Sequence, residues 1–79
     1  MTKIKEVRLQ KGLTQKELSE KSGVSIRTLQ HYEQGSKNFD HARIDTLLNV
    51  CETLKCTLYD ILENEDYKEK LKKVMNNFL

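Results

Sequence analysis

The sequence contains no proline, and its three glycines divide the first half of the chain at intervals of 11 and 12 residues. Gly12, Gly23 and Gly35 each follow a stretch in which apolar residues recur every three or four positions. Glycine readily adopts the left-handed backbone conformation that commonly ends a helix, and proline is the residue that most strongly breaks one. The pattern therefore predicts an all-α fold built from short helices joined by tight glycine turns.

Residues that can cap helices precede the first three of these stretches. Thr2 is placed to cap a first helix that ends near Gly12. Thr14 and Glu17 have the spacing of a capping box, in which each side chain accepts a backbone hydrogen bond from the other residue. Ser25 is placed to cap a third helix that ends at Gly35. The segment 15–35 is thus expected to be a helix, a glycine turn and a second helix.

A fourth and a fifth helix are expected after the polar loop 36–38. Asp40 is the predicted N-cap of the fourth helix, with Phe39 packed on Ile44 as a hydrophobic staple. Thr57 is the predicted cap of the short fifth helix. Helical spacing places the following residues on the inward face of the fourth helix: Ile44, Leu47, Leu48, Cys51 and Leu54.

Beyond an acidic break at 63–66, the chain ends in an amphipathic pattern. The apolar positions of this stripe are Tyr67, Leu71, Val74, Met75 and Phe78, and lysines occupy the opposite face. The stripe either folds back on the core of its own chain or pairs with the same stripe of a second chain. The organisation predicted is therefore a domain over 1–64 and a further helix over 65–79, the latter a candidate dimer contact.

Charge is distributed unevenly along this chain of 79 residues. The net charge of +2 divides into +3 for residues 1–34, −4 for 35–66 and +3 for 67–79. A basic first half is expected where one face meets a polyanion. No apolar run approaches the length of a membrane-spanning helix, and no signal peptide is evident, so a cytoplasmic location is expected.

Residues that could support other chemistry are sparse. Two cysteines and two histidines give little basis for a zinc site, and Cys51 and Cys56 are expected to be reduced core residues. The sequence has no catalytic triad, phosphate-binding glycine loop or zinc-protease motif. We therefore expect no enzyme activity, metal or cofactor, and no membrane contact. A small-molecule effector is not expected either, because no separate effector domain is recognisable.

The segment 15–35 has the residue types that a helix-turn-helix requires at the corresponding positions. Leu18, Val24 and Leu29 are placed to fix the two helices to the core, Ser19 is small enough for their close crossing, and Gly23 suits the turn. The second helix then keeps a polar outer face that can enter a DNA major groove.

The stretch LTQKELSEKSGVSIRTLQHYEQG resembles the N-terminal part of the Cro/phage-repressor-like, or XRE, family of helix-turn-helix regulators. The resemblance extends from about Ile4 to Leu62 and includes the closing Leu-Tyr-Asp-Ile-Leu at 58–62. Ser19 stands where alanine is commoner, and Phe39 stands where proline is frequent. The resemblance implies a five-helix, repressor-like DNA-binding domain, here with an additional C-terminal helix, that acts on double-stranded DNA as a homodimer.

The resemblance also assigns roles to individual residues. It implies that Arg8 and Glu33 form a structural ion pair. It implies DNA contacts from the following residues: Gln15 to a phosphate, Ser25, Ile26, Arg27, Thr28 and His31 to bases or backbone, and Lys37 and Asn38 to the sugar-phosphate chain.

The residue chemistry is compatible with these roles and with simpler ones. Arg27 can donate two hydrogen bonds to guanine, and Ile26 can contact a thymine methyl group. Arg27 is otherwise a solvated surface residue, and Ile26 and His31 otherwise cover the helix.

The function predicted is a sequence-specific transcriptional regulator of repressor type. The alternative is a protein-interaction module of the same fold, similar to an antitoxin or anti-regulator, with little DNA binding. The polar outer face favours the regulator, whereas the low net charge favours the module.

Overall fold

The computed structural model describes the backbone of residues 1–78 and the side chains of residues 1–76. The described residues form helices and loops without a strand, in agreement with the all-α prediction. The elements are α1 (Lys3–Gln10), α2 (Gln15–Ser22), α3 (Ile26–Gln34), the single-turn 3-10 helix η1 (Phe39–His41), α4 (Ile44–Leu54), α5 (Leu58–Ile61) and α6 (Glu65–Phe78).

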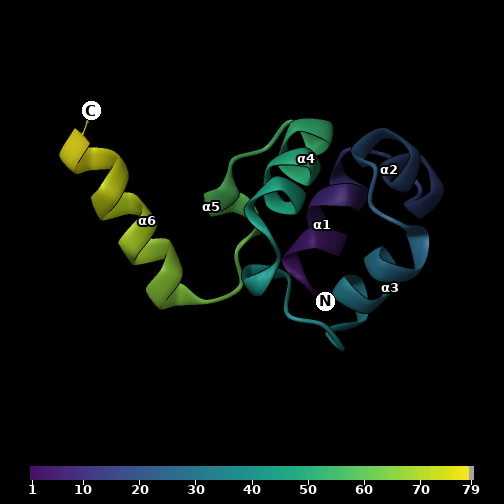
Figure 1. The fold of residues 1–79 in the computed structure, drawn as a ribbon, viewed down its shortest axis with the longest axis horizontal. Coiled ribbons are helices and arrows are strands. Elements are labelled where there is room, and N and C mark those ends of the chain that lie inside the picture. Colours follow the sequence, from purple (N-terminus) through teal and green to yellow (C-terminus); the bar gives the residue numbers. More distant parts are fainter. Residues whose placement is uncertain (79) are drawn as a thin grey trace.

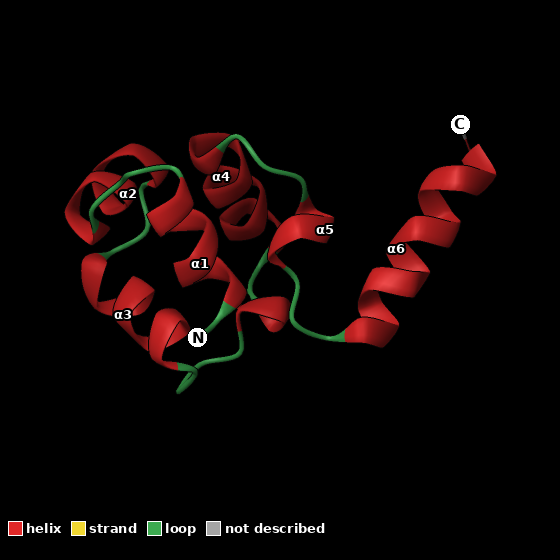
Figure 2. Ribbon diagram, turned by 180° about the vertical axis from the view of Figure 1, so that it is seen from behind, coloured by secondary structure: helices red, strands yellow, loops and turns green. Residues whose placement is uncertain are grey.

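The helices α1 to α5 pack around one core, whereas α6 extends away from it (Figures 1 and 2). α2 packs against α3 and α4, and α1 packs against α3 and α5. The largest fully buried side chains are Ile4, Leu18, Leu29, Val50, Leu54 and Ile61. Every one of the helices α1 to α5 contributes to this set, so a single apolar cluster fixes the position of α3 in the domain.

The predicted caps of α2 and α3 are present. Thr14 accepts a hydrogen bond from the backbone of Glu17, and the Glu17 carboxylate accepts one from the backbone of Thr14. The backbone and side-chain hydrogen bonds with Thr14 lower the pKa of Glu17 below its usual value. Ser25 accepts a hydrogen bond from the backbone of Thr28, and Gly23 and Gly35 end the two helices with φ of 77° and 82°. The local sequence signals therefore set the limits of both helices.

Thr2 and the start of the fourth helix differ from the predictions. The Thr2 hydroxyl donates to the carbonyl oxygen of Glu33 at 3.0 Å and does not cap α1. α4 begins after Arg43, and Asp40 lies in η1. The Asp40 carboxylate instead accepts hydrogen bonds from the backbone N–H groups of Glu63 and Asn64 at 2.9 and 2.8 Å. In both cases the side chain hydrogen-bonds to a group distant in sequence and not to the backbone at the start of the nearby helix.

The predicted hydrophobic staple is also wrong. Phe39 is buried with its ring edge against Tyr32, and their ring centroids are 5.1 Å apart. Ile44 is 64% exposed and Leu48 is 55% exposed. Because η1 uses Phe39 to close the core, α4 starts later and turns a different face inward. Its buried residues are Leu47, Val50, Cys51 and Leu54.

Candidate nucleic-acid interface

The α2–turn–α3 unit is held to the core by apolar side chains from both helices. Leu18 and Leu29 are fully buried, and Val24 in the turn packs partly buried against the same cluster. The Ser19 hydroxyl donates to the carbonyl oxygen of Val24 at 2.6 Å. This hydrogen bond joins the turn to α2. Ser19, which was expected only to be small, therefore also has a polar role.

The first turn of α3 presents its side chains to solvent. Ser25 and Arg27 are exposed, Ile26 is 42% exposed, and Thr28 is half-buried. The Ser25 hydroxyl donates to the Thr28 hydroxyl at 2.8 Å. An exposed arginine beside an exposed branched apolar residue can contact both a guanine edge and a thymine methyl group.

His31 lies one turn further along α3 and is half-buried. Its Nδ1 is 2.9 Å from the Ser36 hydroxyl, which also lies 3.2 Å from the His31 carbonyl oxygen. The His31 ring is thereby tied to the loop that follows the helix. Sequence reasoning missed Ser36, because no local motif couples a serine after the glycine turn to a ring five residues earlier.

Gln15, the first residue of α2, has its amide directed at the acidic partner of Arg8. Its Nε2 donates to Glu33 Oε1 at 3.1 Å. Arg8 donates to both carboxylate oxygens of Glu33, at 2.7 and 2.9 Å, and also to the carbonyl oxygen of Leu13 at 2.8 Å. The structure thus brings the residues of the predicted ion pair together and adds Gln15 to them. This position orients Gln15 at the start of α2, beside α3.

The loop after α3 carries the two remaining candidate residues, Lys37 and Asn38, and both are exposed. The Lys37 backbone N–H donates to the carbonyl oxygen of His31 at 3.2 Å. The Asn38 side-chain oxygen accepts from the backbone of Asp40 at 3.0 Å and caps η1. The loop is therefore joined to α3 on one side and to η1 on the other.

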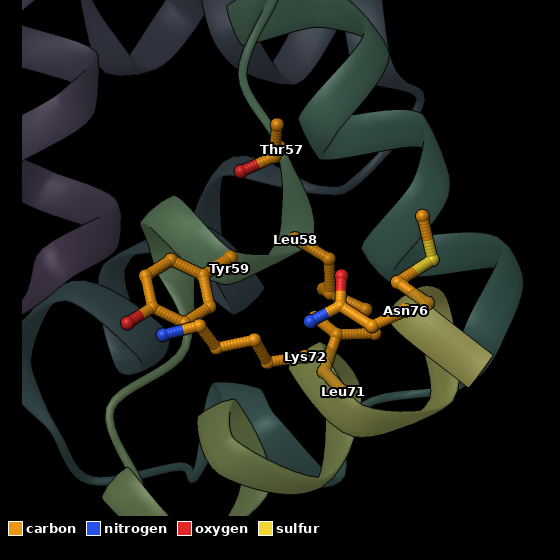
Figure 3. A pocket seen from close by; sticks show the side chains of 7 residues that line it. Thr57, Leu58, Tyr59, Leu71, Lys72 and Asn76 are labelled. Atoms are coloured by element: carbon orange, nitrogen blue, oxygen red, sulfur yellow. The ribbon is translucent and has the colours of Figure 1, made fainter. Parts of the chain in front are cut away.

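An apolar groove of about 420 Å³ lies away from α3, between α5 and α6 (Figure 3). Val74 and Met75 of the apolar stripe on α6 are exposed, and the Phe78 side chain, predicted on the same stripe, lies outside the described residues. Among the residues that the structure describes, no group of three or more His, Cys, Asp or Glu side chains is arranged to hold a metal ion. None of the described helices is long and apolar enough to cross a membrane. Burial raises the pKa of the Cys51 thiol to about 12 and also raises the pKa of Cys56.

The sequence is similar to known helix-turn-helix proteins. A helix-turn-helix family model matches residues 4–61, from the second residue of α1 to the end of α5. The chain is 32% identical over 78 residues to the "Uncharacterized HTH-type transcriptional regulator YqaE" of Bacillus subtilis (strain 168). That alignment covers 94% of this chain, and the chain spans about two-thirds (65%) of the relative's length. No solved structure gives a significant match.

Proposed function

The chain belongs to the XRE-type helix-turn-helix family, and from this premise we propose that it is a sequence-specific DNA-binding transcriptional regulator that acts as a repressor. The observation that carries the proposal is the first turn of α3, where Ser25, Ile26 and Arg27 are exposed on a helix whose opposite side is fixed by Leu29. A rigid helix with such a face can be inserted into the major groove as a unit.

Arg27 is the proposed source of base selectivity. Its exposed guanidinium can donate two hydrogen bonds to the O6 and N7 of a guanine, which contributes about 1–3 kcal/mol of discrimination. Ile26 contacts a thymine methyl group in this arrangement. Thr28 and His31 complete the face, the former through its hydroxyl and the latter through the ring edge. If the base pair that Arg27 contacts is not a guanine pair, the guanidinium finds fewer acceptors, so the affinity falls for DNA that carries that change.

Gln15, Lys37 and Asn38 are the proposed phosphate contacts. Gln15 lies at the N-terminal end of α2, where backbone N–H groups and the helix dipole favour an anion. Lys37 and Asn38 lie in the exposed loop that follows α3. Phosphate contacts from the start of α2 and from this loop set the register of α3 on the duplex without reading bases. Because phosphate contacts release counterions, we expect the affinity to fall steeply with salt.

A homodimer is the proposed functional unit. Two copies related by a two-fold axis would place their α3 helices in successive major grooves on the same side of the duplex. The two half-sites would then lie about 34 Å apart, or a multiple of that distance. We therefore expect the operator to be an inverted repeat.

The test begins with selection of bound sequences from a random oligonucleotide pool by the full chain. Arg27→Ala is then compared with Lys37→Ala on the best selected site and on random DNA. We expect Arg27→Ala to weaken binding to the selected site far more than to random DNA, and Lys37→Ala to weaken both about equally. If Arg27→Ala loses the same factor in affinity for the selected site as for random DNA, base reading by Arg27 is excluded. The absence of any binding to random DNA at low salt would favour the protein-interaction module, which the small net charge also favours.

A further inference from the structure

The Ser36 hydroxyl contacts two groups of His31 from the loop that follows α3. Its oxygen is 2.9 Å from His31 Nδ1 and 3.2 Å from the His31 carbonyl oxygen. The backbone on both sides of Ser36 is fixed as well. Gly35 ends α3 with φ of 82°, and the Lys37 backbone N–H donates to the same carbonyl oxygen of His31 at 3.2 Å. Ser36 is therefore held against the His31 ring by the turn in which it lies.

These two contacts determine which ring nitrogen carries the proton of the neutral imidazole. A serine hydroxyl has one hydrogen to donate and accepts further hydrogen bonds through its oxygen. If Nδ1 of His31 carries the proton, it donates to Ser36 Oγ while the hydroxyl donates to the carbonyl oxygen. If Nε2 carries the proton, the single hydroxyl hydrogen serves only one of its two neighbours, and the other contact brings lone pairs together. The Nδ1–H tautomer thus makes two hydrogen bonds where the Nε2–H tautomer makes one.

The Nδ1–H tautomer leaves Nε2 of His31 as a hydrogen-bond acceptor. Among the hydrogen bonds of the described residues, the His31 ring uses Nδ1 alone. Nδ1 is turned toward the backbone of its own helix, so Nε2, across the ring, points away from it. His31 follows Arg27 by four residues, so the two side chains project from the same side of α3. An acceptor therefore lies beside the arginine donor of the proposed reading face.

We propose that Ser36 fixes the tautomer of His31, and that His31 consequently reads a base with an amino group in the major groove. Cytosine N4 and adenine N6 are the donors available there, whereas guanine and thymine present acceptors and no donor. The Nε2 lone pair accepts from the first two bases and is repelled by the O6 or O4 oxygen of the others. His31 is thus the complement of Arg27, whose guanidinium donates and selects guanine. The inference rests on the proposed function and deepens it, with Ser36 as a positioning residue that needs no DNA contact of its own.

NMR spectroscopy of the full chain without DNA tests the tautomer directly. The protonated and unprotonated nitrogens of a neutral imidazole differ widely in 15N chemical shift, and long-range couplings to the ring protons identify each nitrogen. We expect the neutral His31 ring to carry its proton on Nδ1. Ser36→Ala removes the acceptor of Nδ1–H and should move the proton to Nε2 in a large part of the molecules, whereas Ser36→Thr keeps a hydroxyl and should restore the wild-type signature. His41, whose ring contacts Tyr67, is the internal reference and should not change.

Selection of bound DNA sequences tests the base preference. The position that His31 reads is the one at which His31→Ala removes the preference of the wild type. We expect the wild type to favour cytosine or adenine there by about fivefold over guanine or thymine, which is the effect of one hydrogen bond. Ser36→Ala should lose this preference or reverse it toward guanine, and should change it no further in the His31→Ala background, because Ser36 acts through the ring. Lys37→Ala, in the same loop, is the matched control and should keep the preference while binding every sequence more weakly.

The following results would overturn the inference. A proton on Nε2 in the wild type, or a tautomer that Ser36→Ala does not alter, would remove the role of Ser36. A preference for guanine or thymine at the His31 position would show that Nε2 donates. Equal weakening of all sequences by Ser36→Ala, with the preference kept, would make Ser36 a phosphate contact. Failure of the proposed function gives a separate result: an Nδ1–H ring that responds to Ser36→Ala in a chain that binds no DNA upholds the tautomer and overturns only the base preference.

Discussion

Arg8 holds the Glu33 carboxylate through two hydrogen bonds, from Nε to Oε2 at 2.7 Å and from a terminal nitrogen to Oε1 at 2.9 Å. The two side chains are only 9% and 2% exposed. The pair joins α1 to the last turn of α3, and Gln15 adds a bond from α2. One buried polar cluster thereby connects the three helices that position the proposed reading face.

We expect Glu33→Ala to reduce the free energy of unfolding by about 3–5 kcal/mol, because it leaves the Arg8 guanidinium buried without its carboxylate. Urea denaturation followed by circular dichroism measures this change. Glu20→Ala, at an exposed position on α2, is the matched control and should change stability by about 0.5 kcal/mol or less. Replacing both residues, as in Arg8→Met with Glu33→Met, should cost less than Glu33→Ala. A loss below about 1 kcal/mol for Glu33→Ala would contradict the structural role of the pair.

Lys55 ends α4 in the left-handed conformation, with φ of 53° and ψ of 48°. A side chain in this conformation costs about 1–2 kcal/mol, whereas glycine adopts it without that cost. Part of the gain is offset because glycine loses more backbone entropy on folding. We therefore expect Lys55→Gly to raise the free energy of unfolding by about 0.5–1 kcal/mol and to raise the melting temperature accordingly.

Gly23 provides the opposite control at the end of α2. Its φ is 77°, and a Cβ atom built there would meet nothing within 4 Å. Gly23→Ala should therefore cost about 1–2 kcal/mol from the backbone alone, and Gly23→Asn should cost less, since asparagine tolerates this conformation better. Equal thermal stabilities for Lys55→Gly and Gly23→Ala would show that left-handed strain does not govern these helix ends.

The helix-turn-helix was predictable because its signals are local. Thr14, Glu17 and Ser25 make hydrogen bonds to groups three residues away, and Gly23 and Gly35 end helices through their own backbone conformation. A short sequence window contains everything that such contacts require. The exposure of Ser25, Ile26 and Arg27 follows from the same pattern, since Leu29 fixes which side of α3 faces inward.

The parts that were not predicted depend on contacts distant in sequence. Asp40 is a residue type that commonly caps helices, but the backbone N–H groups that it accepts from are 23 and 24 residues away. Gln15 has the position of a phosphate ligand, yet its amide also donates to Glu33, 18 residues along the chain. Helical periodicity alone could not distinguish a core face of α4 containing Ile44 from one containing Val50. The stripe of α6 has the same limitation, since its spacing does not say which molecule covers it.

The two thiols give a prediction for pH. Burial, with a further contribution from neighbouring Cys56, raises the pKa of Cys51 from the usual 9.0 to about 12, and burial raises that of Cys56 as well. Folding thus favours the protonated thiols. Their contribution to stability is complete below pH 9 and is lost as the pH rises toward 12. We expect iodoacetamide to modify both cysteines much more slowly in the native chain than in urea at pH 9, because the thiolate is the reactive form.

The control for this prediction separates the thiols from other groups that titrate at high pH. Cys51→Ala with Cys56→Ala loses some packing but should lose less stability than the wild type between pH 8 and pH 10.5. The comparison uses the change in unfolding free energy between the two pH values, so the packing loss cancels. A native Cys51 that is alkylated as fast as in urea would contradict its raised pKa.

Asp40 gives the last prediction, because it connects η1, next to the Lys37–Asn38 loop, to the start of α6. Its carboxylate accepts two backbone hydrogen bonds there, and Asp40→Asn keeps the shape but leaves only one accepting oxygen. Loss of a hydrogen bond to a charged group typically costs about 1.5–3 kcal/mol, and exposure of Asn64 places the expected loss near the lower limit. Hydrogen exchange should accelerate at the amides of Glu63, Asn64 and the first turn of α6, whereas exchange at the core amides of α2 and α3, which are distant from this contact, should change much less. Glu52→Gln, which neutralises an exposed carboxylate on α4, is the control and should leave exchange at α6 unchanged. Unaltered exchange at Glu63 and Asn64 in Asp40→Asn would show that the carboxylate does not hold α6 in place.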